Sequence, residues 1–359
     1  MMLGCSVYLG NRSDEEQETY LKEMSQAGFQ FIFTSLHILE DDTTHFKDLL
    51  KTLGRQARTY NMDLVADISP VSFQLLGFTP DTIEEIKTWG VNGLRLDYGL
   101  EPITVAKLSH TMKIALNAST ITLDFVQDLL KANINLNQVE AWHNYYPRIE
   151  TGLDKNDFIK QNIMLKKLGF KVMAFVPGDK LLRGPLNEGL PTLEQHRNEP
   201  PFQSFLELIH ECNVDKVAIG DISLQKDTLL QFEKMVDGSI PLRSTIHTQH
   251  PPTKSIIALN HHNRMDAARD VIRSKTSRTY TANKNYIIHP ENTTERAIGS
   301  ITIDNEQYGR YHGELQIVKK NLPINEKVNV VGRVIEQDLN LLKYIKSGQG
   351  FTIINILLD

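Results

Sequence analysis

Eight short apolar segments recur along the first 236 residues, and an amphipathic segment follows each of them. The apolar segments have the length and composition of buried β-strands, and they begin at residues 3, 31, 64, 94, 113, 138, 171 and 216. The segments between them carry helix signals, such as Ser13 before three acids and Gly28 after the last apolar turn. Eight strand–helix units predict an α/β fold, and they match a (β/α)8 TIM barrel better than an open doubly wound sheet.

The pattern changes near residue 240. Proline occurs at positions 241, 251 and 252, which we interpret as a linker. Short strand-like segments then replace the alternation, at 256–259, 277–280, 301–304, 314–318, 328–331 and 351–354, with one helix predicted over 338–346. The sequence therefore predicts a TIM-barrel domain over residues 1–240 and a smaller β-rich domain over residues 241–359.

Composition and charge exclude several classes of protein. The formal net charge is −5 and the pI is near 6.2, so we expect neither nucleic acid nor a membrane as a partner. No G-x-G-x-x-G or P-loop motif follows a predicted strand, so we expect no cofactor. The two cysteines, Cys5 and Cys212, are too few for a disulfide framework. The first residues lack the basic and apolar regions of a signal peptide, which favours a cytoplasmic location.

The segment Glu140–Arg148, EAWHNYYPR, has polar and aromatic residues where a barrel strand ends. Pro147 lacks a backbone donor, so the strand must end near it. Strand alternation turns Glu140, Trp142 and Asn144 toward the barrel interior. This polar strand end is the strongest sign of chemistry in the chain, because active sites of TIM barrels form at the carboxyl ends of the strands.

Polar residues also end three other predicted strands. Alternation turns Arg95 and Asp97 inward, and it places Asn117 inward at the tip of its strand. Asp67 ends the third strand. These side chains and that of Glu140 are therefore predicted to meet at the mouth of the barrel where catalysis takes place.

Three inward acids allow two kinds of chemistry. One protonated and one ionised carboxyl group can cleave a glycosidic bond. Carboxylates together with Asn117 or His143 could instead hold Mg²⁺ or Zn²⁺. No H-x-H or H-E-x-x-H spacing supports a metal site, so we expect none. A structural interpretation also exists for single acids: Asp67 could cap a loop, and Asp97 could pair with Arg95 in the barrel.

The segment 177–197 after the seventh strand is long and rich in glycine and cations, among them Lys180, Arg183 and Arg197. Loops after strands seven and eight commonly bind phosphate in TIM barrels, and long structured loops are often functional. Arg148, just beyond the polar strand, is our preferred anion ligand on position alone. The sequence therefore predicts an anionic ligand for the barrel.

Longer motifs connect the chain to one family. They lie at 66–69 (ADIS), 94–99 (LRLDYG), 116–119 (LNAS), 142–148 (WHNYYPR), 151–153 (TGL), 183–185 (RGP), 189–194 (GLPTLE) and, in the second domain, 311–317 (YHGELQI). Together they resemble the bacterial 6-phospho-N-acetylmuramidases, a family long described only as outer-surface proteins. The resemblance runs over the full length and implies that the second domain is cyclophilin-like.

The resemblance implies an intracellular, exo-acting glycosidase of cell-wall recycling without a cofactor. Its substrate would be a phosphorylated amino-sugar disaccharide, N-acetylmuramic acid 6-phosphate joined β-1,4 to N-acetylglucosamine. The products would be N-acetylmuramic acid 6-phosphate and N-acetylglucosamine. The absence of a signal peptide agrees with this setting, and the outer-surface description does not.

The resemblance does not assign the individual side chains, so their roles come from the strand pattern. We predict Asp97 and Glu140 as the catalytic pair, with Asp67 as the third candidate. The predicted ligands of sugar hydroxyls or of the acetamido group are Asn117, His143 and Asn144. The predicted ligands of the phosphate or the lactyl carboxylate are Arg148, Arg183 and Lys180.

Three alternatives stay open at this stage. The acetamido group of the substrate could act as the nucleophile, with acids that orient it. The barrel could instead be a non-catalytic phosphosugar sensor, although this gives no reason for several inward acids. The second domain could complete the site, cover the barrel mouth or form a homodimer contact.

Overall fold

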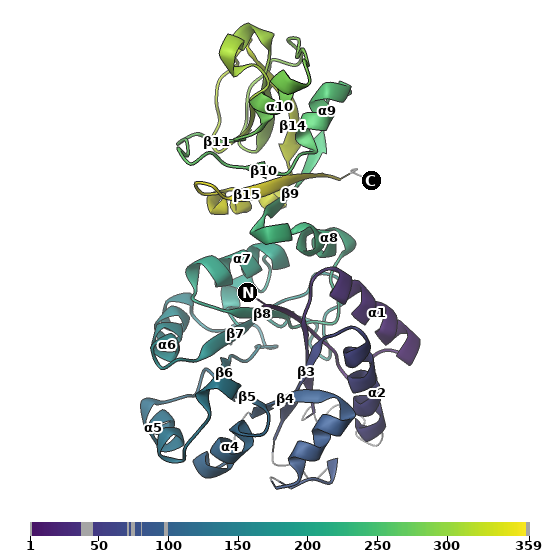
Figure 1. Cartoon of the computed structure of the whole chain (residues 1–359), viewed down its shortest axis with the longest axis vertical. Helices are drawn as coiled ribbons and strands as arrows, with labels where there is room; N and C mark the ends of the chain where they lie inside the picture. The colour runs from purple at the N-terminus through teal and green to yellow at the C-terminus, as the bar shows by residue number, and fades with distance from the viewer. Residues whose placement is uncertain are drawn as a thin grey trace. The chain divides into compact units, whose positions relative to one another are not determined.

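The computed structural model describes residues 2–36, 46–69, 72, 76–79, 81–96 and 100–356. The chain divides into two compact units, Met1–Leu229 and Leu230–Asp359 (Figure 1). Each unit contains its own sheet, so the two are described separately. The sequence pattern places the boundary later, after residue 240.

The first unit is built on eight parallel strands. They are β1 (Met2–Ser6), β2 (Phe31–Ser35), β3 (Asp63–Ile68), β4 (Val91–Leu96), β5 (Lys113–Asn117), β6 (Val139–Trp142), β7 (Lys171–Val176) and β8 (Lys216–Ile219). They pair in sequence order, and β1 pairs with both β2 and β8, which closes the barrel. The predicted TIM-barrel fold is confirmed.

Helices surround this barrel (Figure 1). Those described are α1 (Asp14–Gln26), α2 (Phe46–Thr59), α4 (Pro102–Ser109), α5 (Leu123–Lys131), α6 (Lys155–Lys167), α7 (Pro201–Glu211) and α8 (Lys226–Lys234), with 3₁₀ helices η1 (Ile83–Trp89), η2 (Leu136–Gln138) and η3 (Glu194–His196). α1 begins with the predicted capping box. The backbone N–H of Ser13 donates to the Glu16 carboxylate, and the backbone N–H of Glu16 donates to Ser13 Oγ. Gly28 follows α1 with a φ of 88°, a conformation that glycine adopts without strain.

Large side chains fill the middle of the barrel. The buried residues of this cluster are Phe31, Phe33, Val65, Ala115, Trp142, Met173, Phe175 and Ala218. Two of them come from each of β2 and β7, at alternate positions, as the strand period requires. A packed middle leaves only the two ends of the barrel for polar inward side chains.

The second unit contains a mixed seven-stranded sheet in the order β10-β15-β9-β14-β12-β13-β11. Its strands are β9 (Ile240–Ile246), β10 (His261–His262), β11 (Val271–Arg273), β12 (Ser300–Asp304), β13 (Leu315–Val318), β14 (Val328–Val334) and β15 (Gly350–Asn355). Its helices are α9 (Pro251–Ile257) and α10 (Ser277–Asn283), with 3₁₀ helices η4 (Val236–Gly238), η5 (Glu306–Tyr311) and η6 (Glu336–Tyr344). The predicted β-rich domain is confirmed, whereas its similarity to cyclophilin stays a prediction.

Three local predictions for this unit are wrong. The segment expected as a linker contains β9 and the start of α9. Two prolines can begin α9 because the first N–H groups of a helix have no partner within it, so their loss costs nothing. The segment 256–259, expected as a strand, overlaps α9, and buried Ile256 and Ile257 face the core from it. The segment 277–280 belongs to α10, where packing overrides local strand preference.

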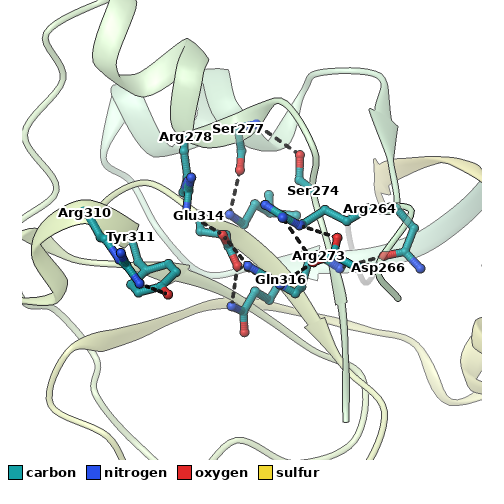
Figure 2. Close-up of polar contacts among 12 residues, drawn as sticks. Arg264, Asp266, Arg273, Ser274, Ser277, Arg278, Arg310, Tyr311, Glu314 and Gln316 are labelled. Atoms are coloured by element: carbon teal, nitrogen blue, oxygen red, sulfur yellow. Dashed lines mark hydrogen bonds and ion pairs between the residues drawn. The ribbon is translucent and has the colours of Figure 1, made fainter. Parts of the chain in front are cut away.

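Figure 2 shows a polar cluster in this unit that joins β11 to the start of β13. The guanidinium of Arg273 donates twice to the carboxylate of Glu314, at 2.7 and 3.1 Å, and that carboxylate is nearly inaccessible to solvent. Burial raises the pKa of the neighbouring Asp304 to about 8, and the charge of Glu314 adds to this effect.

In the part of the chain that is described, no helix is long and apolar enough to cross a membrane.

Candidate active site

A buried ion pair lies at the carboxyl end of the barrel. Asp67 of β3 and Arg95 of β4 are partners in register on adjacent strands, and Arg95 Nη1 donates to Asp67 Oδ1 at 2.8 Å. The two residues are 4% and 2% exposed, so water does not screen the pair. Arg95 Nη2 donates to Asn144 Oδ1 beyond the end of β6. Three strand ends are thereby linked, as the inward positions of these residues predicted.

Two tyrosines and an arginine adjoin this pair. Tyr8 follows β1, and its hydroxyl donates to the carbonyl of Gly220 at 2.5 Å. Burial raises the pKa of Tyr145 to about 12, and the Asp67 carboxylate adds to the rise. The guanidinium of Arg183 lies 4.0 Å from the centre of the Tyr8 ring. A cation and two tyrosine hydroxyl groups therefore lie close to the ion pair at the mouth of the barrel.

A cavity of about 530 Å³ opens beside the strand ends of β4, β5 and β6. Its lining residues are Leu96, Leu100, Val105, Leu116, Asn117, Thr120, Ile121, Thr122, Phe125 and Asn144. This volume lies in the usual range for small-molecule sites, which combine apolar walls with a few polar groups. Asn117 and Asn144 lie where the sequence predicted them, at the carboxyl end of the barrel.

The loop after β7 is held in place by buried polar groups. The Asp221 carboxylate accepts from the backbone N–H groups of Gly178, Arg183 and Leu190, each at 2.9 Å. Burial nevertheless raises the pKa of Asp221. Arg197 donates to Glu194 and to four backbone carbonyls. These bonds stabilise the conformation of the loop. The bond from the Arg183 backbone N–H to Asp221 therefore fixes the position of Arg183 in the loop.

The other predicted anion ligands lie elsewhere. Lys180 lines a separate cavity with Arg12, which precedes α1, and with residues of α1 such as Glu15. Arg148 is exposed on the segment after β6. Of the three predicted cations, Arg183 is the one that contacts the tyrosine pair.

The predicted position of Glu140 is wrong. Its carboxylate accepts from Lys216 Nζ at 2.6 Å and from Trp142 Nε1 at 2.8 Å, at the amino end of the barrel. The small cavity beside it is lined by the first residues of β2, β3, β5 and β8. Glu140 and Asp67 therefore lie at opposite ends, and Glu140 cannot share a substrate with Asp67.

The prediction that His143 contacts a ligand is also wrong. His143 is fully buried between the barrel and α6, where its Nε2 lies 2.8 Å from Asn162 Oδ1 and its ring packs on Phe158. The reason is strand alternation, because Trp142 and Asn144 face inward and the residue between them faces out. Burial lowers the pKa of His143 to about 4, so the ring is neutral near pH 7.

Asp97 lies outside the described residues, so its place in the site stays a prediction. Within the described ranges, no group of three or more His, Cys, Asp or Glu side chains could hold a metal ion. The sequence did not single out Tyr8, Tyr145 or Asp221. Each follows the end of a barrel strand by two or three residues, so the positional rule used for the acids would have found them.

Comparisons with known proteins agree with this architecture. The family model described as 6-phospho-N-acetylmuramidase, N-terminal, matches residues 3–234, and the corresponding C-terminal model matches residues 240–354. A search of curated proteins found no match.

Two solved structures are similar over nearly the whole length. A conserved Enterococcus faecalis protein of unknown function is 41% identical, with a TM-score of 0.84, covering 99% of this chain and 96% of that one. An uncharacterized B. cereus protein is 28% identical, with a TM-score of 0.75, covering 99% of each chain. The family models span both units, and the chain belongs to the 6-phospho-N-acetylmuramidase family.

Proposed function

We propose that this protein is a glycosidase that hydrolyses the β-1,4 bond between N-acetylmuramic acid 6-phosphate and N-acetylglucosamine. The observation that carries the proposal is the family match over both units. The cavity of about 530 Å³ beside the buried Asp67–Arg95 pair supports it, because this is the end of a TIM barrel that carries active sites. The reaction would belong to cytoplasmic recycling of cell-wall sugars.

Asp67 is the described carboxylate best placed for catalysis. Arg95 balances its charge and fixes its orientation, which suits a carboxylate that acts as base, as nucleophile or as the group that orients a substrate amide. We propose Asp97, as predicted from the sequence, as the second acid. Glu140 has no part in this scheme, because it lies at the other end of the barrel.

The pair of acids has a geometric consequence. A separation of about 5–5.5 Å between the carboxyl groups would favour retention of configuration, and roughly 6.5–9.5 Å would favour inversion. If the acetamido group of the substrate is the nucleophile, Asp67 would orient that amide. The stereochemistry of the released sugar, followed by NMR, separates inversion from the other two routes.

Arg183 is the proposed ligand of the phosphate or the lactyl carboxylate. It is 9% exposed, lies over the Tyr8 ring and is anchored through its backbone N–H to Asp221. A guanidinium in a partly dry site binds phosphate strongly and with defined geometry. We expect this contact to select phosphorylated substrates.

The test uses the purified protein with the 6-phosphorylated disaccharide and with its unphosphorylated counterpart. Release of N-acetylglucosamine from the phosphorylated form, with little from the other, is the expected result. Tight binding of the phosphorylated disaccharide without release would overturn the proposal. It would favour the non-catalytic phosphosugar sensor instead.

A further inference from the structure

The motif at 311–317, in the second unit, has no role in the proposed function. Its first residue, Tyr311, ends η5. Two residues later Gly313 has a φ of 80°, and a Cβ atom there would lie 2.5 Å from the Cβ atom of Thr281 in α10. Glycine therefore lets the motif pass close to α10. This close approach brings Tyr311 near Arg278, which α10 carries.

Two guanidinium groups lie close to the ring of Tyr311 (Figure 2). That of Arg278 is 5.4 Å from the ring centre, and that of Arg310 is 5.0 Å from it. Arg310 Nη2 also donates to the Tyr311 hydroxyl at 3.0 Å. Tyr308 packs edge-on against this ring, with the ring centres 5.7 Å apart. Two cations are thus held beside one tyrosine, and we call Arg278, Arg310 and Tyr311 the arginine–tyrosine cluster.

Both arginines of the cluster have donors that the protein leaves available. Arg278 Nη1 lies 3.5 Å from Glu314 Oε2, and within the described ranges this carboxylate is the only hydrogen-bond partner of the Arg278 guanidinium. In the same ranges, the Arg310 guanidinium bonds only to Tyr311. A guanidinium has five N–H donors, so several remain on each arginine. Arg310 is exposed and the Arg278 side chain is 37% exposed, so a dissolved ligand can reach both.

The acids near the cluster do not balance its charge. Glu314 is 1% exposed and accepts two hydrogen bonds from Arg273. Asp304 lies opposite Glu314, and burial raises its pKa to about 8, so it is largely protonated at pH 7. Glu306, the acid of η5, lies 2.8 Å from His289 Nδ1. Arg273 and the two arginines of the cluster carry three positive charges against the one negative charge of Glu314, which leaves an excess of two.

We propose that the arginine–tyrosine cluster binds a phosphate group, either free phosphate or the phosphate of a monoester such as a phosphorylated sugar. A phosphate monoester carries about −1.5 to −2 charges at pH 7, which matches the excess of two positive charges, whereas a carboxylate carries one negative charge. Guanidinium groups bind phosphate oxygens through pairs of parallel N–H donors. The site lies within the second unit and is additional to the proposed catalytic site, so it does not depend on the proposed function.

The experiment measures hydrogen–deuterium exchange of the full-length protein by mass spectrometry. The ligands are inorganic phosphate, N-acetylglucosamine 6-phosphate and neutral N-acetylglucosamine, at equal ionic strength. Peptides covering residues 306–316 report on the cluster and not on the barrel. We expect both phosphates to slow exchange there in a saturable manner and the neutral sugar to have no effect. Arg278→Gln and Arg310→Gln should each weaken the apparent affinity about 10-fold, because each removes charged hydrogen bonds.

Arg269→Gln is the matched control, because Arg269 is an exposed arginine of the same unit that bonds to Asp270. We expect it to change the apparent affinity less than twofold. The proposal fails if neither phosphate slows exchange in the native protein, or if the effect persists in folded Arg278→Gln and Arg310→Gln. An equal loss in Arg269→Gln would also overturn it, because it would indicate general attraction of anions. With the site established, tighter binding of the sugar phosphate would identify a monoester as the ligand, and equal affinities would identify free phosphate.

Discussion

The two ends of the barrel each contain an inward acid paired with a buried cation, yet the space beside these two pairs differs greatly. At the carboxyl end, Arg95 and Asp67 are 2.8 Å apart beside a cavity of about 530 Å³. At the amino end, Lys216 and Glu140 are 2.6 Å apart beside a cavity of about 10 Å³, room for about one water molecule. An inward acid therefore becomes a site candidate only where the surrounding side chains leave space.

The difference in open space beside the two ion pairs follows from what surrounds each end of the barrel. At the amino end, the first residues of several strands pack around Glu140, and the indole of Trp142 closes over it through a hydrogen bond. At the carboxyl end, loops of varied length follow the strands and leave open space between them. Polar residues at the amino end then serve stability, and those at the carboxyl end are available for chemistry.

The sharpest test of this contrast is Asp67→Asn, which keeps the shape and removes the charge. We expect kcat/KM for the phosphorylated disaccharide to fall about 10²–10⁴-fold, the usual contribution of a general acid or base. Steady-state release of N-acetylglucosamine measures it.

The matched control is Asp63→Asn, the same substitution at the amino end of the same strand. Asp63 pairs with Lys113 at 2.6 Å, and both side chains are partly exposed. We expect kcat/KM to change less than twofold, because exposed pairs contribute little. Equal losses in both variants would contradict the contrast between the ends.

Glu140→Gln should lower stability while changing activity little, in contrast to the large loss of activity expected for Asp67→Asn. Removing one partner of a buried pair leaves the Lys216 ammonium without its counter-charge, which typically costs 3–5 kcal/mol. Glu140 keeps some exposure, so we expect about 3 kcal/mol, measured by urea unfolding. The double variant Glu140→Gln with Lys216→Met should recover part of this loss. A drop in kcat of the folded variant comparable to that of Asp67→Asn would restore Glu140 to the site.

The failure to place Glu140 from sequence has a physical cause. The period of two correctly indicates that Glu140 and Trp142 face inward, but it gives no height along the barrel axis. Register places Glu140 opposite Ala115, which is opposite Arg95, which is opposite Asp67. Strands in a barrel are tilted and staggered, so such a row rises along the axis as it passes from strand to strand. The stagger depends on closure of the whole sheet.

Other features could be predicted because they depend on few neighbours. The capping box at Ser13 and the eight strand positions need only local sequence. The helices α9 and α10 were missed because tertiary packing, seen in their buried residues, outweighed the local strand preference of these segments. His143 was predicted as a ligand because the neighbouring motif residues suggested a site. Strand alternation alone would have predicted that its side chain faces outward.

A pH experiment tests whether the buried support of the carboxyl end depends on a neutral His143. The pKa of His143 is about 4 in the folded protein and near 6.5 when unfolded, so between these values the unfolded chain binds the extra proton. Stability therefore falls as pH falls from 6.5 to 4. From pH 7 to pH 5 we expect the native protein to lose about 2 kcal/mol more than His143→Gln, because His261, whose pKa is also lowered to about 4, titrates in both proteins. Urea unfolding of both proteins at the two pH values measures it, and parallel losses would contradict this.

The smallest expected effect separates the two buried cations that lie near aromatic rings. Arg183 is 4.0 Å from the Tyr8 ring centre at the carboxyl end, and Lys216 is 5.7 Å from that of Phe31 at the amino end. Arg183→Gln should raise KM for the phosphorylated disaccharide about 10-fold with little change in kcat, because it removes one charged contact to the phosphate. Lys216→Gln should leave KM unchanged and lower the unfolding free energy. If instead Lys216→Gln raised KM and Arg183→Gln did not, the anion would bind through the amino end, and the contrast between the two ends would be lost.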